Sequence, residues 1–336
     1  MKVEVISKGL FSLIVDEGRK GKQRQGFSRS GPMDEIAYSW ANFLAHNPDN
    51  TPCLEVMGKM TVCFHEPTIV AVAGRQVKVQ VNGHDQPSYS SIKVNKNDRL
   101  SFESEYVGSK AYLAICGQWK VPYHVDSACT VVRESLGGLH GDGRVISDSD
   151  CIDISRCDEQ TYATLSVRQL PIRHSMSMQH GISIKHIMSI KCGENVAYDL
   201  NAPLRVIKGY QEAHFSQVAK RMFESSEYTV SSSIDRMGYR LTGADIASSL
   251  SSMRSEAIHV GAIQVPPDGQ PIIMMRDRQT LGGYPKLGCL NPLDVSRLAQ
   301  RVPGETVSFI FQNSEEARAD ILLSRQHVQR LRGEIA

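Results

Sequence analysis

The chain has 336 residues, of which 41% are hydrophobic and 22% are charged, and its formal net charge is +2. This length exceeds the size at which one hydrophobic core normally stops growing, so two domains are expected. Lysines and arginines are dispersed along the chain instead of forming one stripe. This distribution argues against nucleic acid and against an anionic membrane as partners.

The N-terminal region and the cysteines indicate the compartment. The only apolar stretch near the start is residues 10–15, and acidic residues follow it. A membrane-spanning helix needs roughly 20 apolar residues, so neither a span nor a secretory signal is expected. The eight cysteines include no C-x-x-C pair. We therefore expect reduced thiols, no bound metal and a cytoplasmic location.

The N-terminal half is predicted to contain one clear helix and several strands. The helix covers 33–46, after the start signal Ser30-Gly31-Pro32. Its apolar stripe consists of Ile36, Ala37, Trp40, Ala41 and Leu44. The strands are short and rich in β-branched residues, and they cover 68–74, 76–83 and 111–117. Asn82-Gly83 predicts a tight turn at the end of the second strand.

The segment 174–190 has an alternating pattern with His, Met or Ile at every even position. Its histidines are His174, His180 and His186. Along an extended strand, adjacent ones would lie about 20 Å apart, too far to share a metal ion. We assign this stretch to a linker at 166–190 that joins an N-terminal β-rich lobe, 1–165, to a C-terminal lobe, 191–336.

The C-terminal half again mixes strands with few helices. Helices are expected at 211–222, 292–302 and 313–335. Strands are expected at 230–243, 261–265, 270–275 and 306–312. The fold class is therefore mainly β (α+β). The sequence contains no G-x-x-x-x-G-K-[ST], G-x-G-x-x-G, H-E-x-x-H or G-x-S-x-G motif, so the enzyme classes that these motifs mark are not indicated.

Two polar segments are candidates for a binding site. If 230–243 is one strand, Arg236, Gly238 and Arg240 share a face, and two arginines around a glycine would accept a carboxylate or phosphate. Two solvated arginines on an edge strand are the alternative. The second segment, 277–286, follows an apolar strand with charged residues and a Gly-Gly pair. A solvated hairpin is the alternative there.

Several motifs carry a family resemblance. They are "EGRKG" (17–21), "SRSGPMDEIAYSWAN" (28–42), "CLEV" (53–56), "SLGGLHGDGR" (135–144), "SSSIDRMGYRLTG" (231–243) and "GAIQVPPDGQPIIMMRDRQTLGGYPKLG" (261–288). In this order they resemble the biotin-dependent carboxyltransferase family, also called allophanate hydrolase subunit 2, which the C subunit of the prokaryotic 5-oxoprolinase typifies.

The resemblance implies two linked β-rich lobes, the C-terminal one a cyclophilin-like β-barrel. It implies a homologue of the 5-oxoprolinase B subunit as direct partner and a homologue of its A subunit as third component. Such complexes open the lactam of 5-oxo-L-proline to L-glutamate and consume ATP. The substrate would then be a small amide or lactam. Which component holds ATP is not implied.

The implied chemistry suggests roles for the polar residues. A substrate carboxylate and a transferring phosphate need cations, which Arg236, Arg240 and Lys286 would supply. Backbone N–H groups of Gly282 and Gly283 would stabilise developing negative charge. Asp277 or His214 would act as general base. The further substrate-binding candidates are Asp34, Gln264, Gln279, Thr280 and Tyr284.

Two other functions remain open. One is a carboxyltransferase component that acts on urea or a similar amide, with biotin brought by a separate carrier. The other is a non-catalytic regulator that binds a kinase-inhibitor-type homologue of the B subunit.

Overall fold

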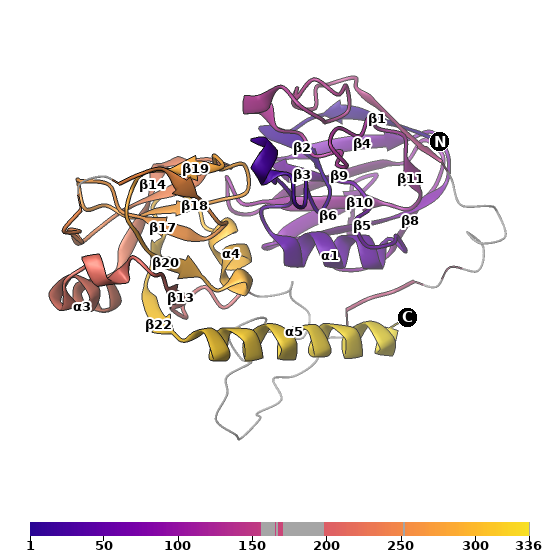
Figure 1. The fold of residues 1–336 in the computed structure, drawn as a ribbon. Coiled ribbons are helices and arrows are strands. Elements are labelled where there is room, and N and C mark those ends of the chain that lie inside the picture. Colours follow the sequence, from indigo (N-terminus) through magenta and orange to yellow (C-terminus); the bar gives the residue numbers. More distant parts are fainter. Residues whose placement is uncertain (156–164, 166, 171–197, 251–252, 336) are drawn as a thin grey trace.

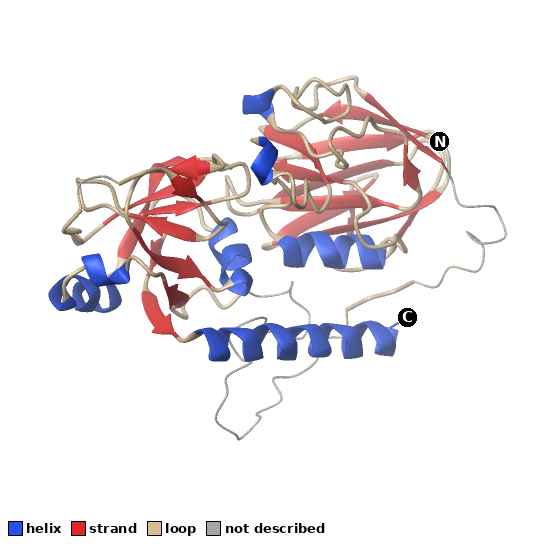
Figure 2. Ribbon diagram, in the orientation of Figure 1, coloured by secondary structure: helices blue, strands red, loops and turns tan. Residues whose placement is uncertain are grey.

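The computed structural model describes residues 1–155, 165, 167–170, 198–250 and 253–335. They form two β-rich lobes that lie side by side, and a long C-terminal helix runs from the second lobe back beneath the first (Figure 1). Strands dominate both lobes (Figure 2), as the sequence predicts. None of the described helices is long and apolar enough to cross a membrane.

The N-terminal lobe is a sandwich of two sheets, whose strands within the described residues follow. The outer sheet has the order β11-β12-β1-β4-β9-β6-β7, with β1 (Lys2–Ser7), β4 (Met60–Phe64), β6 (Val77–Val81), β7 (His84–Gln86), β9 (Arg99–Ser104), β11 (Gln118–Trp119) and β12 (Cys151–Ser155). The inner sheet has the order β2-β3-β10-β5-β8, with β2 (Phe11–Val15), β3 (Cys53–Met57), β5 (Thr68–Gly74), β8 (Ile92–Val94) and β10 (Ala111–Ile115). Alternating side chains from both sheets fill the space between them.

The predicted strands of this lobe are confirmed as β5, β6 and β10. Val77 and Val79 of β6 are buried while Lys78 is exposed, as alternation requires. Asn82 and Gly83 both have positive φ, at 51° and 82°, and close the hairpin from β6 to β7. This is the turn geometry that Asn-Gly favours.

The C-terminal lobe is a single curled sheet of eight strands within the described residues, in the order β21-β14-β15-β18-β17-β20-β13-β22. The strands are β13 (Leu204–Lys208), β14 (Tyr228–Ile234), β15 (Gly238–Thr242), β17 (Ala262–Gln264), β18 (Ile272–Met274), β20 (Lys286–Leu290), β21 (Thr306–Val307) and β22 (Phe309–Gln312). Its two edge strands follow each other in the chain, separated by Ser308, so the sheet bends into a nearly closed barrel. A separate pair, β16 (Glu256–Ala257) and β19 (Leu281–Gly282), lies beside it.

Four α-helices are found in the described part of the chain: α1 (Glu35–Leu44), α3 (Gln217–Ser225), α4 (Pro292–Ala299) and α5 (Ser314–Ile335). Single turns of 3₁₀ helix occur at Gln23–Gln25, Val132–Glu134 and Glu212–His214. Asp34 caps α1 by accepting from the backbone N–H of Ile36 and Ala37, and Asn291 caps α4. The helices expected at 33–46, 292–302 and 313–335 are therefore confirmed.

Two element predictions need correction. The helix expected at 211–222 begins only at Gln217, because Ser216 caps it and a 3₁₀ turn precedes it. The segment 230–243 is a hairpin instead of one strand. Asp235 accepts hydrogen bonds from the N–H groups of Met237 and Gly238, at 2.7 and 3.0 Å, and this side-chain turn ends β14.

Residues 167–170 of the predicted linker lie in the described part of the chain. Residues 167–170, assigned to the linker, pack on the N-terminal lobe: Arg168 N–H donates to Ser91 Oγ, and Leu170 joins the apolar cluster under α1. Helix α5 also returns to that lobe, where Leu331 enters the same cluster. Most of the linker and the histidine-containing pattern at 174–190 lie outside the described residues.

Candidate functional site

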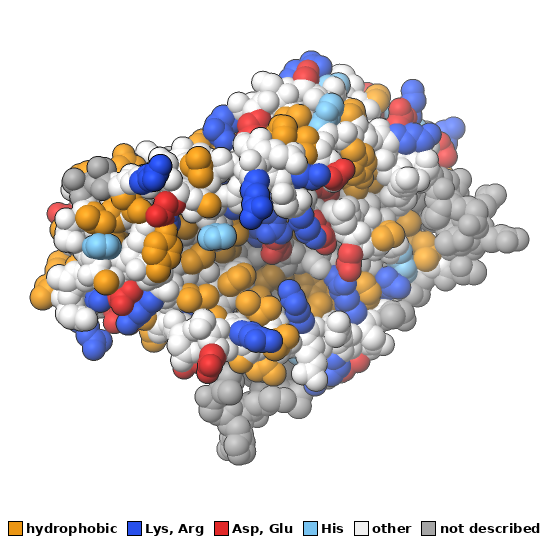
Figure 3. Space-filling model, in the orientation of Figure 1, with side chains coloured by type: hydrophobic (Ala, Val, Ile, Leu, Met, Phe, Trp, Pro, Cys, Tyr) orange, Lys and Arg blue, Asp and Glu red, His pale blue; other side chains and the backbone are white. Residues whose placement is uncertain are grey.

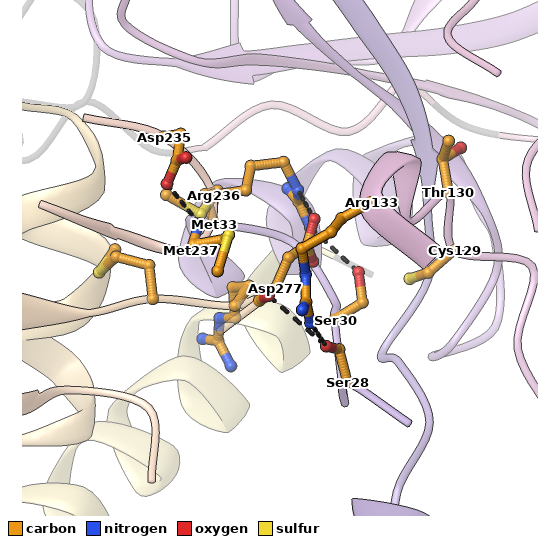
Figure 4. A network of polar contacts seen from close by, with 12 residues as sticks. Ser28, Ser30, Met33, Cys129, Thr130, Arg133, Asp235, Arg236, Met237 and Asp277 are labelled. Carbon is orange, nitrogen blue, oxygen red and sulfur yellow. Dashed lines mark hydrogen bonds and ion pairs between the residues drawn. The ribbon is translucent and has the colours of Figure 1, made fainter. Parts of the chain in front are cut away.

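The two lobes meet around the buried guanidinium of Arg236, which Figure 4 shows between side chains of both lobes. Its Nε and Nη2 donate to the two carboxylate oxygens of Asp277, at 2.7 and 3.0 Å. Its Nη1 donates to Glu55 Oε1 at 2.5 Å, and its Nη2 also reaches Gly31 O at 2.7 Å. Arg236 is only 9% exposed, so the chain itself supplies its carboxylate partners.

Arg236 and Arg240 were expected to share an anion-accepting face, and the structure contradicts this. Arg236 lies in the turn before β15, whereas Arg240 lies on β15 and pairs with Asp268 at the surface, 2.9 Å away. Asp277, proposed as a base, has both oxygens occupied by Arg236. These residues therefore belong to the lobe junction or to the surface.

Asp34 and His214 lie in contrasting surroundings. Asp34 is fully buried, and its carboxylate accepts from Gln300 Nε2 at 2.7 Å as well as from the α1 backbone. Burial raises the pKa of Asp34, although these hydrogen bonds oppose the rise. His214 is exposed on its 3₁₀ turn, and no contact between its ring and Asp277 is found within the described residues.

Replacing Asp34 with Ala should therefore destabilise the protein instead of acting on catalysis alone. The change removes the cap of α1 and the acceptor that Gln300 of the other lobe uses, at a cost of about 2–3 kcal/mol. Urea unfolding monitored by circular dichroism measures this. An Asp34→Ala protein as stable as the parent chain would contradict the assignment of Asp34 to the junction.

A pocket of about 360 Å³ lies in the C-terminal lobe next to the predicted strand-end segment. Its lining residues are Gly209, Tyr210, Gln211, Glu256, Ala257, His259, Ala262, Lys286, Gly288 and Cys289. Such a volume falls within the usual range for small-molecule sites. Four of the ten lining residues are glycine or alanine. We call this the barrel pocket.

The charged groups of the barrel pocket form one connected set. Lys286 Nζ lies 3.3 Å from Glu256 Oε2. The same oxygen accepts from Gln211 Nε2 at 2.9 Å and from the Tyr210 hydroxyl. The Tyr210 hydroxyl and Lys286 hold the pKa of Glu256 below its usual range. Glu256 therefore remains ionised at neutral pH and holds the Lys286 side chain in place.

Three further predicted residues pack beside this pocket. Gln264 lies opposite Lys286 in the β17–β20 ladder, is 2% exposed, and its Nε2 has no hydrogen-bond partner among the described residues. A Cβ atom on Gly282 would lie 2.8 Å from that Nε2 and 3.3 Å from Gln279 Nε2. Gly282 therefore keeps room for two amide groups, and the Gln264 amide is a buried donor without a partner in the described part of the chain.

The other predicted residues have simpler positions. Tyr284 is exposed, and Thr280 accepts at its carbonyl from Ile258 N–H and from Gln23 Nε2, both at 3.1 Å. A Cβ atom on Gly283 would lie 2.9 Å from the Met253 carbonyl, so packing accounts for glycine there. Burial raises the pKa of the Cys289 thiol to about 11, so little of it is thiolate at neutral pH.

A comparison with known proteins agrees with this fold. The family described as carboxyltransferase domain, subdomain A and B, matches residues 25–311, which include both lobes and the barrel pocket. The chain belongs to this family. The carboxyltransferase assignment confirms the resemblance that the sequence motifs predicted.

The similar proteins include one of about the same length as this chain and others in which the matching region is a small part of a longer chain. The chain is 28% identical to the 5-oxoprolinase C subunit of Escherichia coli K12, over 98% of this chain and 96% of that protein. It is 26% identical to urea amidolyase of Saccharomyces cerevisiae, over 94% of this chain but only 17% of that protein. The solved urea carboxylase of Kluyveromyces lactis shares the fold, with a TM-score of 0.76, 24% identity, and coverage of 94% of this chain and 28% of that one.

Proposed function

We propose that this carboxyltransferase-family chain is the C subunit of a 5-oxoprolinase-type complex that hydrolyses a small lactam with ATP, together with homologues of the A and B components. The observation that carries the proposal is the end-to-end match with the E. coli 5-oxoprolinase C subunit, 98% of one chain and 96% of the other. The name of that relative supports membership of a complex.

The barrel pocket supports a substrate of this class. A lactam with an exocyclic carboxylate is small and anionic, and it needs one cation and a donor for the amide oxygen. Lys286 would bind the carboxylate, and the unpartnered Gln264 Nε2 would donate to the amide oxygen. ATP would supply activation of that oxygen by phosphorylation. We propose Gln279, Gly282 and Gly283 as the neighbouring wall of this site.

The isolated chain should show little or no cleavage of 5-oxoproline, because the site is shared with a partner. The chain co-expressed with homologues of the A and B components should release glutamate in proportion to ATP consumed. A coupled glutamate assay with and without ATP measures both. Robust turnover by the purified chain alone would contradict the shared site, and an inactive but assembled complex would contradict the substrate.

A second candidate function has its own support, since relatives include urea amidolyase and the family is one of carboxyltransferases. In that case the chain would accept a carboxyl group from biotin on a separate carrier and pass it to urea or a similar amide. Urea-dependent consumption of carboxybiotin by the chain, with no cleavage of 5-oxoproline by the complex, would favour this alternative.

A further inference from the structure

A second pocket, distinct from the barrel pocket, is bordered by basic side chains from three parts of the fold. It measures about 390 Å³ and lies between α1, the loop that precedes it and α5. Its cations are Lys20, Arg29 and Arg325, and its carboxylates are Glu17, Glu35 and Asp49. Tyr38, Ser39, Asn42 and Asn50 complete a polar wall. We call it the helix pocket.

Each carboxylate of the helix pocket already has a basic partner. Glu17 pairs with Lys20, and Asp49 pairs with Arg332 of α5 at 3.3 Å. Glu35 pairs with Arg276 at 2.8 Å and lies 3.9 Å from Arg29. The three lining carboxylates equal the three lining cations in number, and Arg276 and Arg332 add positive charge beside them.

More positive charge lies behind Arg29, at the junction of the lobes. Arg29 Nη2 and Arg276 Nη1 both approach Glu35 Oε1, at 3.9 and 2.8 Å, and Arg278 Nη1 lies 3.5 Å from the Arg276 backbone carbonyl. Figure 3 shows basic side chains gathered where the lobes meet. Arg278 donates to backbone carbonyls, and no ion pair of Arg278 or Arg325 is found within the described residues.

The environment of these arginine side chains is electrostatically unfavourable. Burial, and then the charges of Arg276 and Arg29, lower the pKa of Arg278 to about 10. Arg29 Nε and Arg276 Nε are both buried without a hydrogen-bond partner among the described residues. Buried donors without acceptors destabilise a fold, and so do like charges held close together. A bound oxyanion beside Arg29 would reduce the repulsion among these like charges.

From this geometry we propose that the helix pocket binds a phosphate group, contacted by Arg29 and Arg325 and held in the positive field of Arg276 and Arg278. Guanidinium groups match phosphate oxygens with paired hydrogen bonds. A single carboxylate carries one negative charge, whereas a phosphate carries nearly two and matches several converging cations better. The polar wall would accommodate the rest of a phosphate-bearing small molecule.

This proposal does not depend on the proposed reaction, because it concerns binding by the chain alone. Isothermal titration calorimetry of the purified chain with inorganic phosphate and with ATP tests it, and L-glutamate serves as the carboxylate probe. We expect saturable binding of one ATP or phosphate per chain. Binding should weaken at least tenfold in Arg29→Gln and in Arg325→Gln. Arg325 forms no ion pair within the described residues, and the carboxylate paired with Arg29, that of Glu35, is 3.9 Å away.

The matched control is Arg221→Gln, because the Arg221 side chain is 84% exposed on α3, in the other lobe. It changes the net charge equally and should bind as the parent chain does. ATP binding without measurable phosphate binding would still support the proposal and identify a nucleotide as the source. Absence of saturable binding, equal affinity in all variants, or glutamate bound as tightly as the phosphate compounds would overturn it. Thermal melts of each variant establish that it is folded.

Discussion

Replacing Arg236 with Ala should lower the free energy of unfolding by about 3–5 kcal/mol, the range for removing one partner of a buried ion pair. The change leaves two buried carboxylates, Asp277 at 5% and Glu55 at 4% exposure, without their cation. One of them belongs to each lobe. The variant should therefore weaken the junction between the lobes as well as the fold.

Urea unfolding of the isolated chain measures this effect without an activity assay. Arg240→Ala is the control, because Arg240 and Asp268 are 41% and 51% exposed in their side chains and form only a surface pair. Such pairs contribute about 0–1 kcal/mol. Arg236→Lys should recover only part of the loss, because an ammonium cannot bind Asp277 with two parallel hydrogen bonds.

The same variants distinguish a junction residue from a substrate-binding one. If Arg236→Ala unfolds like the parent chain while the assembled complex loses turnover, Arg236 binds substrate after all. The sequence expectation of an anion-accepting face at Arg236 would then be restored, and our assignment of Arg236 and Asp277 to the junction would be wrong.

Local signals in the sequence predicted the elements that depend on neighbouring residues. Asn82-Gly83 specifies a hairpin turn by its own backbone preference, and Asp34 lies directly before the apolar stripe of α1. The hairpin at 230–243 was missed although its signal is local. The Asp235 side chain accepts from the backbone N–H of Met237, two residues later, and so forms a turn. The strand-forming residues on both sides of Asp235 hid this signal.

The candidate site depended on contacts that no local pattern reveals. Arg236 pairs with Glu55, which is 181 residues away in the chain, so the isolated motif "SSSIDRMGYRLTG" looks like an open anion site. Lys286 was predicted from the strand-end segment, but its partner Glu256 comes from another segment. The two side chains that donate hydrogen bonds to Glu256, Tyr210 and Gln211, come from a third. These segments are distant in the sequence and become neighbours only when the sheet curls into the barrel.

Lys286→Met should lower kcat/KM for 5-oxoproline in the assembled complex by about 10²–10³-fold, which corresponds to roughly 3–4 kcal/mol of lost transition-state binding. Methionine keeps most of the length of the side chain and removes the charge that we propose to bind the substrate carboxylate. The cost in stability should be small, because Glu256 is 37% exposed in its side chain and keeps Tyr210 and Gln211 as donors.

Lys78→Met is the matched control, since Lys78 is exposed on β6 of the other lobe and the same charge is removed. It should leave kcat/KM within about twofold, less than 0.5 kcal/mol.

A companion variant, Glu256→Gln, removes the carboxylate that holds Lys286 but leaves the ammonium in place. It should therefore reduce activity less than Lys286→Met does, mainly by letting the Lys286 side chain move. If Lys286→Met retains full activity in a complex that assembles normally, the barrel pocket does not bind the substrate carboxylate. A loss of activity that accompanies a loss of assembly would instead place Lys286 in the contact with the partner protein.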